Sequence, residues 1–333
     1  MPGAARRAAA VDTLKSLCYN PKVRQLDLTK LKTYPAGSRK SKVTFSAFAR
    51  VCRKGGSFLE YYESLPNFLA VKEFRIVVDA IVAAHQQRKT VLWMFGAHVL
   101  KVGLSPLLLE LIKRKVITAI AMNGAGVIHD FELAFMGATS EDVAAALADG
   151  SFGMAEETHS RINAAIRAGA KKGWGLGHSV GAMIAASRLP HRQLSLLATC
   201  YRLGVPATVH VAIGTDIIHQ QSSADGAAIG KTSLADFRKL AGVVSTLGPG
   251  AVVGNLGSAV ILPEVFLKTV SIARNLGHPV KDFTAFDFDM TRHYRPAENV
   301  LKRPTLMGGR AVHVTGHHEL LIPLLVRAII EQL

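Results

Sequence analysis

From residue 58 to the C-terminus, short apolar runs alternate with longer segments of helical periodicity. Such runs are typical of strands that are buried on both faces, and helices between them indicate a parallel sheet covered on each side. The expected strands are residues 90–95, 117–122, 207–213, 251–255, 283–288 and 311–315, and the expected helices are 73–87, 105–115, 127–136, a helical block over 140–203, 233–246, 263–275 and 317–332. We therefore predict an α/β, Rossmann-like fold with a mostly parallel sheet.

The composition is that of a globular protein with a sizeable core. Of the 333 residues, 49% are hydrophobic and 19% are charged, with a mean hydropathy of +0.23. No apolar run is long enough to span a bilayer, and no pattern typical of a secretory signal follows the first arginines. Cys18, Cys52 and Cys200 are far apart and form no Cys-x-x-Cys motif, which favours a reducing, cytoplasmic setting over a disulfide framework.

Positive charge is concentrated at the N-terminal end of the chain. Up to Lys54 there are 13 Lys and Arg against two Asp, so this segment carries +11 of the net charge of +16. We expect a basic arm over residues 1–57 and a single NAD-binding catalytic domain over 58–333. The arm is suited to a solvated role, to packing on a neighbouring subunit or to binding an acidic protein, and the absence of interleaved aromatic residues disfavours nucleic acid.

The predicted strands end in segments that combine small residues with polar or titratable ones. In parallel sheets, ligands bind outside the carboxyl ends of the strands. The segments concerned are residues 96–98, 123–126, 214–216, 257–258, 287–289 and 316–318. Their recurrence after six strands predicts a ligand site at this edge of the sheet.

The segment from Asn123 to Asp130 combines a glycine-rich turn with two titratable side chains. Glycines between a strand and a helix let backbone N–H groups approach a phosphate, and the helix N-terminus adds partial positive charge. His129 and Asp130 follow in the first turn of the expected helix, and the ordinary pKa of a histidine suits acid–base work near neutral pH. We predict a cofactor cradle with an adjoining acid–base pair.

The histidines and acidic residues near the strand ends also raise the question of a metal site. His317 and His318 are adjacent, and neighbouring residues of a helix point in different directions. No His-x-x-x-His spacing accompanies them, so we expect these side chains to bind substrate or to be structural, with no metal.

Five segments carry a resemblance to a known family. They are FGAHVLKVG at 95–103, NGAGVIHD at 123–130, LGSAVI at 256–261, Thr284-Ala285 with Arg295-Pro296, and AVHVTG at 311–316. In order and spacing, from about residue 70 to the end, they resemble the deoxyhypusine synthase family, and most closely its deoxyhypusine synthase-like branch. The resemblance implies a Rossmann-like homotetramer with active sites at a subunit interface. It further implies that NAD oxidises spermidine and that an aminobutyl group moves, through an imine on a lysine, to an acceptor amine.

The resemblance also implies roles for individual residues. The expected cofactor contacts are Gly96, Ala97, His98, Lys101, Asn123, Gly124, Ala125, Gly126, Asp216, Thr284, Ala285, His317 and His318. The expected substrate contacts are His219, Glu264, Asp289 and His293, with His129 and Asp130 as acid–base groups. Lys302 is the candidate for the imine, two positions from Pro304, where the lysine of the family falls.

Where the family has carboxylates at the catalytic end, this chain has His129, His219 and His317. A dicationic polyamine that leaves water requires carboxylates to pair its charges. Two alternatives to an aminobutyl transferase therefore stand. One is an NAD-dependent enzyme of the same fold that acts on a less cationic substrate without a lysine imine. The other is a non-catalytic binding scaffold with a basic arm.

Overall fold

The computed structural model describes residues 24–333, and contacts divide the chain into a unit that ends at Ser46 and a unit of residues Ala47–Leu333. Residues 24–46 contain short 3-10 turns and no strand: η1 (Leu28–Lys30), η2 (Ala36–Ser38) and the start of η3 (Phe45–Ala47). Residues 1–23 of the predicted arm, with Cys18, lie outside the described residues. The boundary at residue 57 stays a prediction.

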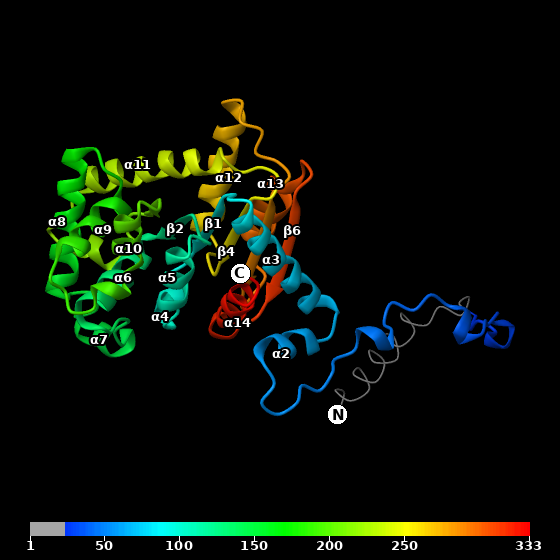
Figure 1. The fold of residues 1–333 in the computed structure, drawn as a ribbon. Helices are drawn as coiled ribbons and strands as arrows, with labels where there is room; N and C mark the ends of the chain where they lie inside the picture. The colour runs from blue at the N-terminus through cyan, green and yellow to red at the C-terminus, as the bar shows by residue number, and fades with distance from the viewer. Residues whose placement is uncertain (1–23) are drawn as a thin grey trace, which may run out of the picture. The chain divides into compact units, whose positions relative to one another are not determined.

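Six strands form one sheet in the second unit (Figure 1). The strands are β1 (Val91–Phe95), β2 (Ala119–Asn123), β3 (Ala207–His210), β4 (Val252–Leu256), β5 (Thr284–Asp289) and β6 (Arg310–Thr315). Their order is β3-β2-β1-β4-β5-β6, and every neighbouring pair is parallel. The predicted α/β fold with a parallel sheet is confirmed, and each of the six predicted strands has its counterpart.

Helices connect the strands throughout. They are α2 (Phe58–Ser64), α3 (Leu69–Gln86), α4 (His98–Lys101), α5 (Ser105–Lys113), α6 (Gly124–Met136), α7 (Val143–Asp149), α8 (Glu156–Lys172), α9 (Leu176–Ala186), α10 (Leu196–Leu203), α11 (Gly226–Val244), α12 (Ile261–Asn275), α13 (Arg303–Thr305) and α14 (His318–Ile330), with 3-10 turns η4 (Arg192–Leu194) and η5 (Ile217–Gln220) and a π-helical segment η6 (Pro296–Lys302). In Figure 1, α8, α9 and α10 lie together at the left of the sheet.

Helices α6 and α11 begin earlier than the sequence predicts, because an acceptor side chain caps each of them. The Asn123 side chain accepts the N–H of Gly126 at 3.1 Å, so α6 begins at Gly124 and the expected glycine loop is its first turn. The Asp225 side chain accepts the N–H of Ala228 at 3.0 Å, and α11 therefore begins at Gly226, ahead of the predicted start at residue 233.

Hydrophobic cores cover both faces of the sheet. Alternate residues of β1 point to opposite faces, Trp93 and Phe95 to one and Leu92 and Met94 to the other. Residues of α3, α5 and α14 pack in the first core, and residues of α12 and η6 with the second half of α11 pack in the other. This burial on both sides explains why the strands are apolar without alternation.

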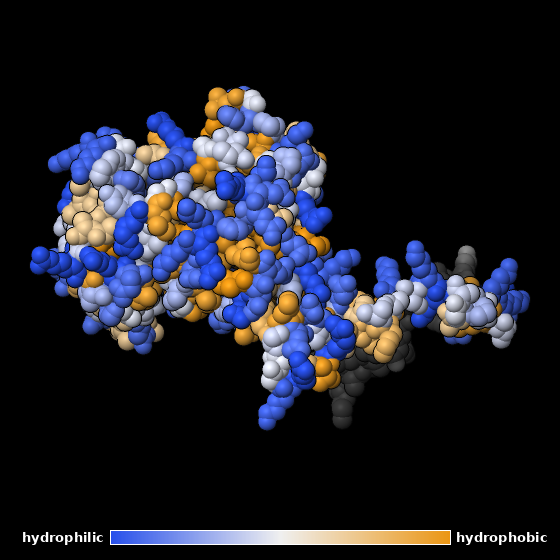
Figure 2. Space-filling model, viewed as in Figure 1, coloured by the Kyte–Doolittle hydropathy of each residue, from blue (hydrophilic) through white to orange (hydrophobic). Residues whose placement is uncertain are grey.

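The surface drawn in Figure 2 is mostly hydrophilic, with hydrophobic residues in scattered groups. Within residues 24–333, no helix has the length and apolar character needed to cross a membrane.

Asp236 on α11 ties three elements of the fold together. Its side chain is fully buried, and Oδ2 accepts the N–H of Gly177 at the start of α9 and the N–H of Val209 in β3, each at 2.9 Å. Oδ1 has no hydrogen-bond partner among the described residues. Burial raises the pKa of this carboxyl to about 7, against the pull of the two N–H donors.

The raised pKa of Asp236 predicts a pH-dependent stability. In the unfolded chain the Asp236 carboxyl loses its proton above its ordinary pKa of 3.8, whereas in the folded protein it keeps the proton up to about pH 7. The free energy of unfolding of the wild type should therefore fall as the pH rises from about 4 to about 7. Asp236→Asn removes the titration. Between about pH 5 and about pH 8, its free energy of unfolding relative to the wild type should rise by about 1–3 kcal/mol. Urea denaturation measures this, and a constant difference would contradict the raised pKa.

Candidate active site at the carboxyl ends of the strands

The carboxyl ends of the six parallel strands lie on one edge of the sheet, where the segments after them meet. Residues 96–98 follow β1, 214–216 lie beyond the end of β3, 257–258 follow β4 and 316–318 follow β6, as expected. Asn123 ends β2, and α6 begins directly after it.

Thr284 and Ala285, two of the expected cofactor contacts, lie elsewhere. They begin β5 and pair with Arg310 and Ala311 at the start of β6. This is the amino end of the strands, and Ala285 is fully buried in a hydrophobic core. The structure therefore does not bring these two residues to the edge where the others lie.

A cavity of about 180 Å³ lies at this edge beside α6 and the segment after β3. It is lined by Lys101, Ala125, Ile128, His129, Glu132, Ser140, Glu141, Val143, Phe152, Thr215, Asp216 and Ile217. Four predicted site residues are thus brought together: Lys101, Ala125, His129 and Asp216. Sites for drug-sized ligands measure roughly 300–1,000 Å³, so this cavity suits a small group or one end of a larger molecule.

His129 presents a neutral ring to the cavity. Its Nδ1 lies 2.6 Å from Oγ1 of Thr139, and its Nε2 has no partner among the described residues. Burial, and then the nearby ammonium of Lys101, lower the pKa of His129 to about 4. A ring that is neutral at pH 7 and has a free nitrogen can accept a proton.

Two carboxylates of the cavity, Glu132 and Glu141, were missed by the sequence reasoning. Glu132 is only 7% exposed, and it accepts hydrogen bonds from Oγ1 of Thr139 at 2.5 Å and from Oγ1 of Thr158 at 3.2 Å. Glu141 accepts the N–H of Gly153 at 2.9 Å. Neither residue lies at a strand end. The available signal was the spacing of His129 and Glu132, which places them on one face of a helix.

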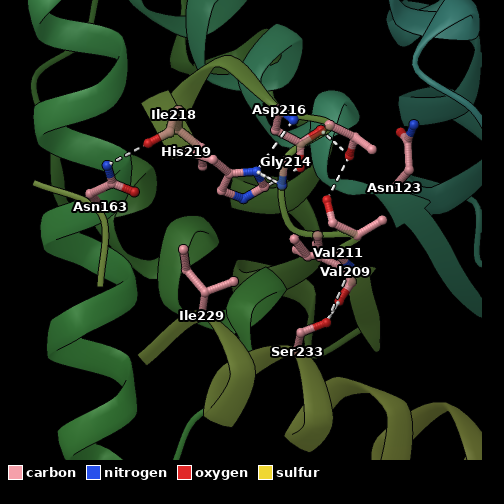
Figure 3. A network of polar contacts seen from close by, with 12 residues as sticks. Asn123, Asn163, Val209, Val211, Gly214, Asp216, Ile218, His219, Ile229 and Ser233 are labelled. Carbon is pink, nitrogen blue, oxygen red and sulfur yellow. Dashed lines mark hydrogen bonds and ion pairs between the residues drawn. The ribbon is translucent and has the colours of Figure 1, made fainter. Parts of the chain in front are cut away.

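Asp216 is a buried carboxylate at the start of α6 (Figure 3). A Cβ added at Gly124 would lie 1.8 Å from its Oδ2, so only glycine leaves room for this side chain. Oδ2 has no hydrogen-bond partner within residues 24–333. Burial raises the pKa of Asp216, opposed by His219 and Thr215. The carboxylate therefore offers a free acceptor atom at the cavity.

His219, an expected substrate contact, orients towards Asp216. Its Nδ1 accepts the N–H of Gly214 at 3.1 Å and that of Asp216 at 3.3 Å, as the dashed lines in Figure 3 show. The ring proton is therefore on Nε2, which lies 3.8 Å from Oδ2 of Asp216. The side chain is buried and does not line the cavity.

Asp130 points away from the cavity. It is fully buried and accepts hydrogen bonds from Oγ of Ser195 at 2.5 Å and from the N–H groups of Leu196 at 2.6 Å and Leu197 at 3.2 Å. Burial raises its pKa to about 6. The geometry is that of a side chain that holds the N-terminus of α10 on α6.

At the junction of β1 and β4 the backbones approach closely. A Cβ at Gly96 would lie 2.5 Å from the carbonyl oxygen of Gly257. His318 is fully buried there and donates from Nε2 to the carbonyl of Phe288 at 3.0 Å, while its Nδ1 lacks a partner among the described residues. The ring centres of His98 and His318 are 5.6 Å apart. Burial is the main cause that lowers the pKa of His98, and the charge of His318 is the second.

Glu264 belongs to a second cavity, of about 430 Å³, lined by His210, Val211, Gly230, Ser233, Leu234, Phe237, Val260, Ile261, Glu264 and Val265. Its carboxylate pairs with Lys268, with Nε of Arg295 at 3.2 Å and with Nδ2 of Asn299 at 2.8 Å. The bond to Lys268 is the first cause that lowers the pKa of Glu264.

The remaining predicted residues lie outside both cavities. Nε2 of His293 is 3.8 Å from Oδ2 of Asp289, and His317 is exposed beside Glu319. Lys302 lies at the end of η6, where its ammonium is 3.3 Å from Glu298 and its side chain is 67% exposed.

No group of three or more His, Cys, Asp or Glu side chains is placed to hold a metal ion within the described part of the chain.

Comparisons with known proteins find no matching family model and no matching curated protein. A candidate deoxyhypusine synthase from Entamoeba histolytica matches with a TM-score of 0.51 and 13% identity, over 84% of this chain and 94% of that chain. A conserved candidate LOR/SDH protein from Methanococcus maripaludis matches with a TM-score of 0.50 and 13% identity, over 79% and 70%. These two likenesses establish a shared fold.

The arginine dihydrolase ArgZ, from the ornithine–ammonia cycle of cyanobacteria, matches with a TM-score of 0.48 and 15% identity over 80% of this chain. This chain spans about a third of the length of ArgZ, 34%.

The repulsion between the ammonium of Lys101 and a protonated His129 predicts how Lys101→Met changes the pKa of His129. Removing the ammonium should raise the pKa of His129 above about 4, while burial, the larger cause, keeps it below its ordinary value of 6.5. Titration of the ring protons by NMR measures the change. Lys113→Met, at the end of α5 and outside the cavity, is the matched control and should leave this pKa where it is. An unchanged pKa in Lys101→Met would show that the ammonium does not act on the ring.

Proposed function

We propose that this protein is an NAD-dependent enzyme that acts on an amine in the cavity of His129. The observation that carries the proposal is the composition of this cavity, where a histidine with a free Nε2 faces three carboxylates and one ammonium. A substrate ammonium that leaves water requires such carboxylates. Glu132 and Glu141 thus supply negative charge where the family's carboxylates are replaced by histidines. Their presence favours an amine over a less cationic substrate.

The residues at this edge fit the polar parts of NAD. The free Oδ2 of Asp216 suits the hydroxyl groups of a ribose, and the N-terminus of α6 with Lys101 suits a phosphate. The fold shared with a candidate deoxyhypusine synthase agrees with the family resemblance, which implies NAD. When bound, the nicotinamide supplies the acceptor for the hydride that leaves the carbon next to the amine.

The side chains of the protein have separate tasks in this proposal. Glu132 and Glu141 attract the ammonium into the cavity, and Nε2 of His129 accepts the proton that the nitrogen gives up. The apolar walls, Ile128, Val143, Phe152 and Ile217, keep water from the reacting atoms.

The finer form of the proposal is the transfer of an aminobutyl group from spermidine to an acceptor amine, as the resemblance implies, with Lys302 as the lysine that forms the imine. Lys302 does not line the cavity of its own chain, and Pro304 is buried. A homotetramer with shared active sites, also implied by the resemblance, is part of this proposal because a second copy can supply groups that one chain lacks.

Incubation of the purified protein with NAD and either spermidine or putrescine tests the proposal. We expect NAD to bind and its reduced form, or diaminopropane, to appear. His129→Gln should lower the rate by roughly 10²–10⁴-fold, because the proton acceptor is lost. His278→Gln, an exposed histidine outside the cavity, is the matched control and should retain activity.

Borohydride trapping during turnover separates the two forms of the chemistry. An adduct on Lys302, located by peptide mass spectrometry and absent from Lys302→Arg, supports aminobutyl transfer through an imine. Turnover without an adduct on any lysine supports amine oxidation alone. A protein that binds no NAD and leaves every amine unchanged would refute the proposed function.

A further inference from the structure

Three side chains beside the cavity form a hydrogen-bonded chain: His129, Thr139 and Glu132. Helix α6 places His129 and Glu132 three residues apart, on the same face. Gly137, with a φ of 69°, ends the helix in the left-handed conformation and turns the backbone, so Thr139 lies between the two side chains. Oγ1 of Thr139 is 2.6 Å from Nδ1 of His129 and 2.5 Å from Oε2 of Glu132.

The direction of these hydrogen bonds follows from the single hydrogen of the threonine hydroxyl. A carboxylate only accepts, so the hydroxyl donates to Glu132. The oxygen of Thr139 is then left as an acceptor for Nδ1–H of His129. Thr158 on α8 donates to the other oxygen of Glu132 at 3.2 Å and fixes this carboxylate in place. The ring proton is thus on Nδ1, and the lone pair of Nε2 faces the cavity.

We propose that Thr139 and Glu132 are positioning residues that hold His129 as the Nδ1–H form, so that Nε2 serves as a proton acceptor towards a ligand. The identity of that ligand as an amine rests on the proposed function; the orientation of the ring does not. One proton moves from the donor group of the ligand to Nε2, and no electrons are exchanged. The imidazolium that forms keeps its Nδ1–H bond to Thr139 and lies one hydroxyl away from the negative charge of Glu132, which stabilises it.

The low pKa of His129 meets one requirement of this role, a neutral ring before the ligand arrives. Burial, and then the charge of Lys101, lower the pKa to about 4, so the ring is neutral before the ligand arrives. A neutral imidazole has one bare nitrogen. The hydrogen-bonded chain of His129, Thr139 and Glu132, here called the relay, determines that this nitrogen is Nε2.

NMR of protein labelled with ¹⁵N in histidine tests the relay without any substrate. Long-range ¹H–¹⁵N spectra distinguish a protonated from a bare ring nitrogen, and loss of signals in His129→Gln assigns His129. In the wild type and in Thr139→Ser, we expect a protonated Nδ1 and a bare Nε2. In Thr139→Val, which removes the acceptor, the Nε2–H form should appear as a second species. Thr315→Val removes a hydroxyl 2.9 Å from Nε2 of His313 on β6 and should leave the His129 signals unchanged.

The catalytic readout follows in the same variants. With a substrate amine, kcat should fall about tenfold to a hundredfold in Thr139→Val, because part of the rings carries the proton on the wrong nitrogen and the remaining rings lose the hydrogen bond that orients Nε2. Thr139→Ser should restore kcat. An unchanged tautomer in Thr139→Val, or a protonated Nε2 in the wild type, would overturn the relay whether or not the enzyme turns over an amine. The expected spectra together with no reaction on any amine would support the relay and refute only the proposed function.

Discussion

The parallel pairing of β1 with both β2 and β4 is the constraint on which the rest of the structure depends. Because β1 is central, the chain winds outward from it in two halves, and all six strands end on the same edge. The close approach of Gly96 to the carbonyl of Gly257 shows how tightly the two halves meet. Lys101, His129 and Asp216 reach that edge in the segments that follow β1, β2 and β3.

Much of the fold could be predicted from the sequence, and the reason is physical. Strands buried on both faces must be apolar throughout, so they appear as continuous runs such as that of β1. The start of α6 was predicted three residues late because the cap made by Asn123 outweighs the weak helix propensity of the glycines. Asn123 satisfies the N–H of Gly126, and the glycines, which are weak helix formers, become helical.

The candidate site could be predicted only in part. His129 and Asp216 were expected at the edge because they follow predicted strands, and Lys101 was expected there from the family resemblance. His129 and Asp130 were predicted to act together as an acid–base pair, but only His129 faces the cavity. Neighbouring residues of a helix point about 100° apart, which separates the two side chains. Thr139 reaches His129 and Glu132 only after the chain turns at Gly137, and the spacing of residues within α6 does not show this contact.

Burial sets the electrostatic character of this edge. It disfavours charge on His129, whose pKa is lowered, and on Asp216, whose pKa is raised. Perturbed groups of this kind are typical of functional sites.

A crystal structure with NAD and spermidine both bound tests the central claim most directly. The account predicts that a nitrogen of the amine lies within about 2.6–3.2 Å of Nε2 of His129 and that a ribose hydroxyl bonds to Oδ2 of Asp216. An NAD molecule bound away from this edge, or an amine that makes no contact with the cavity of His129, would contradict it.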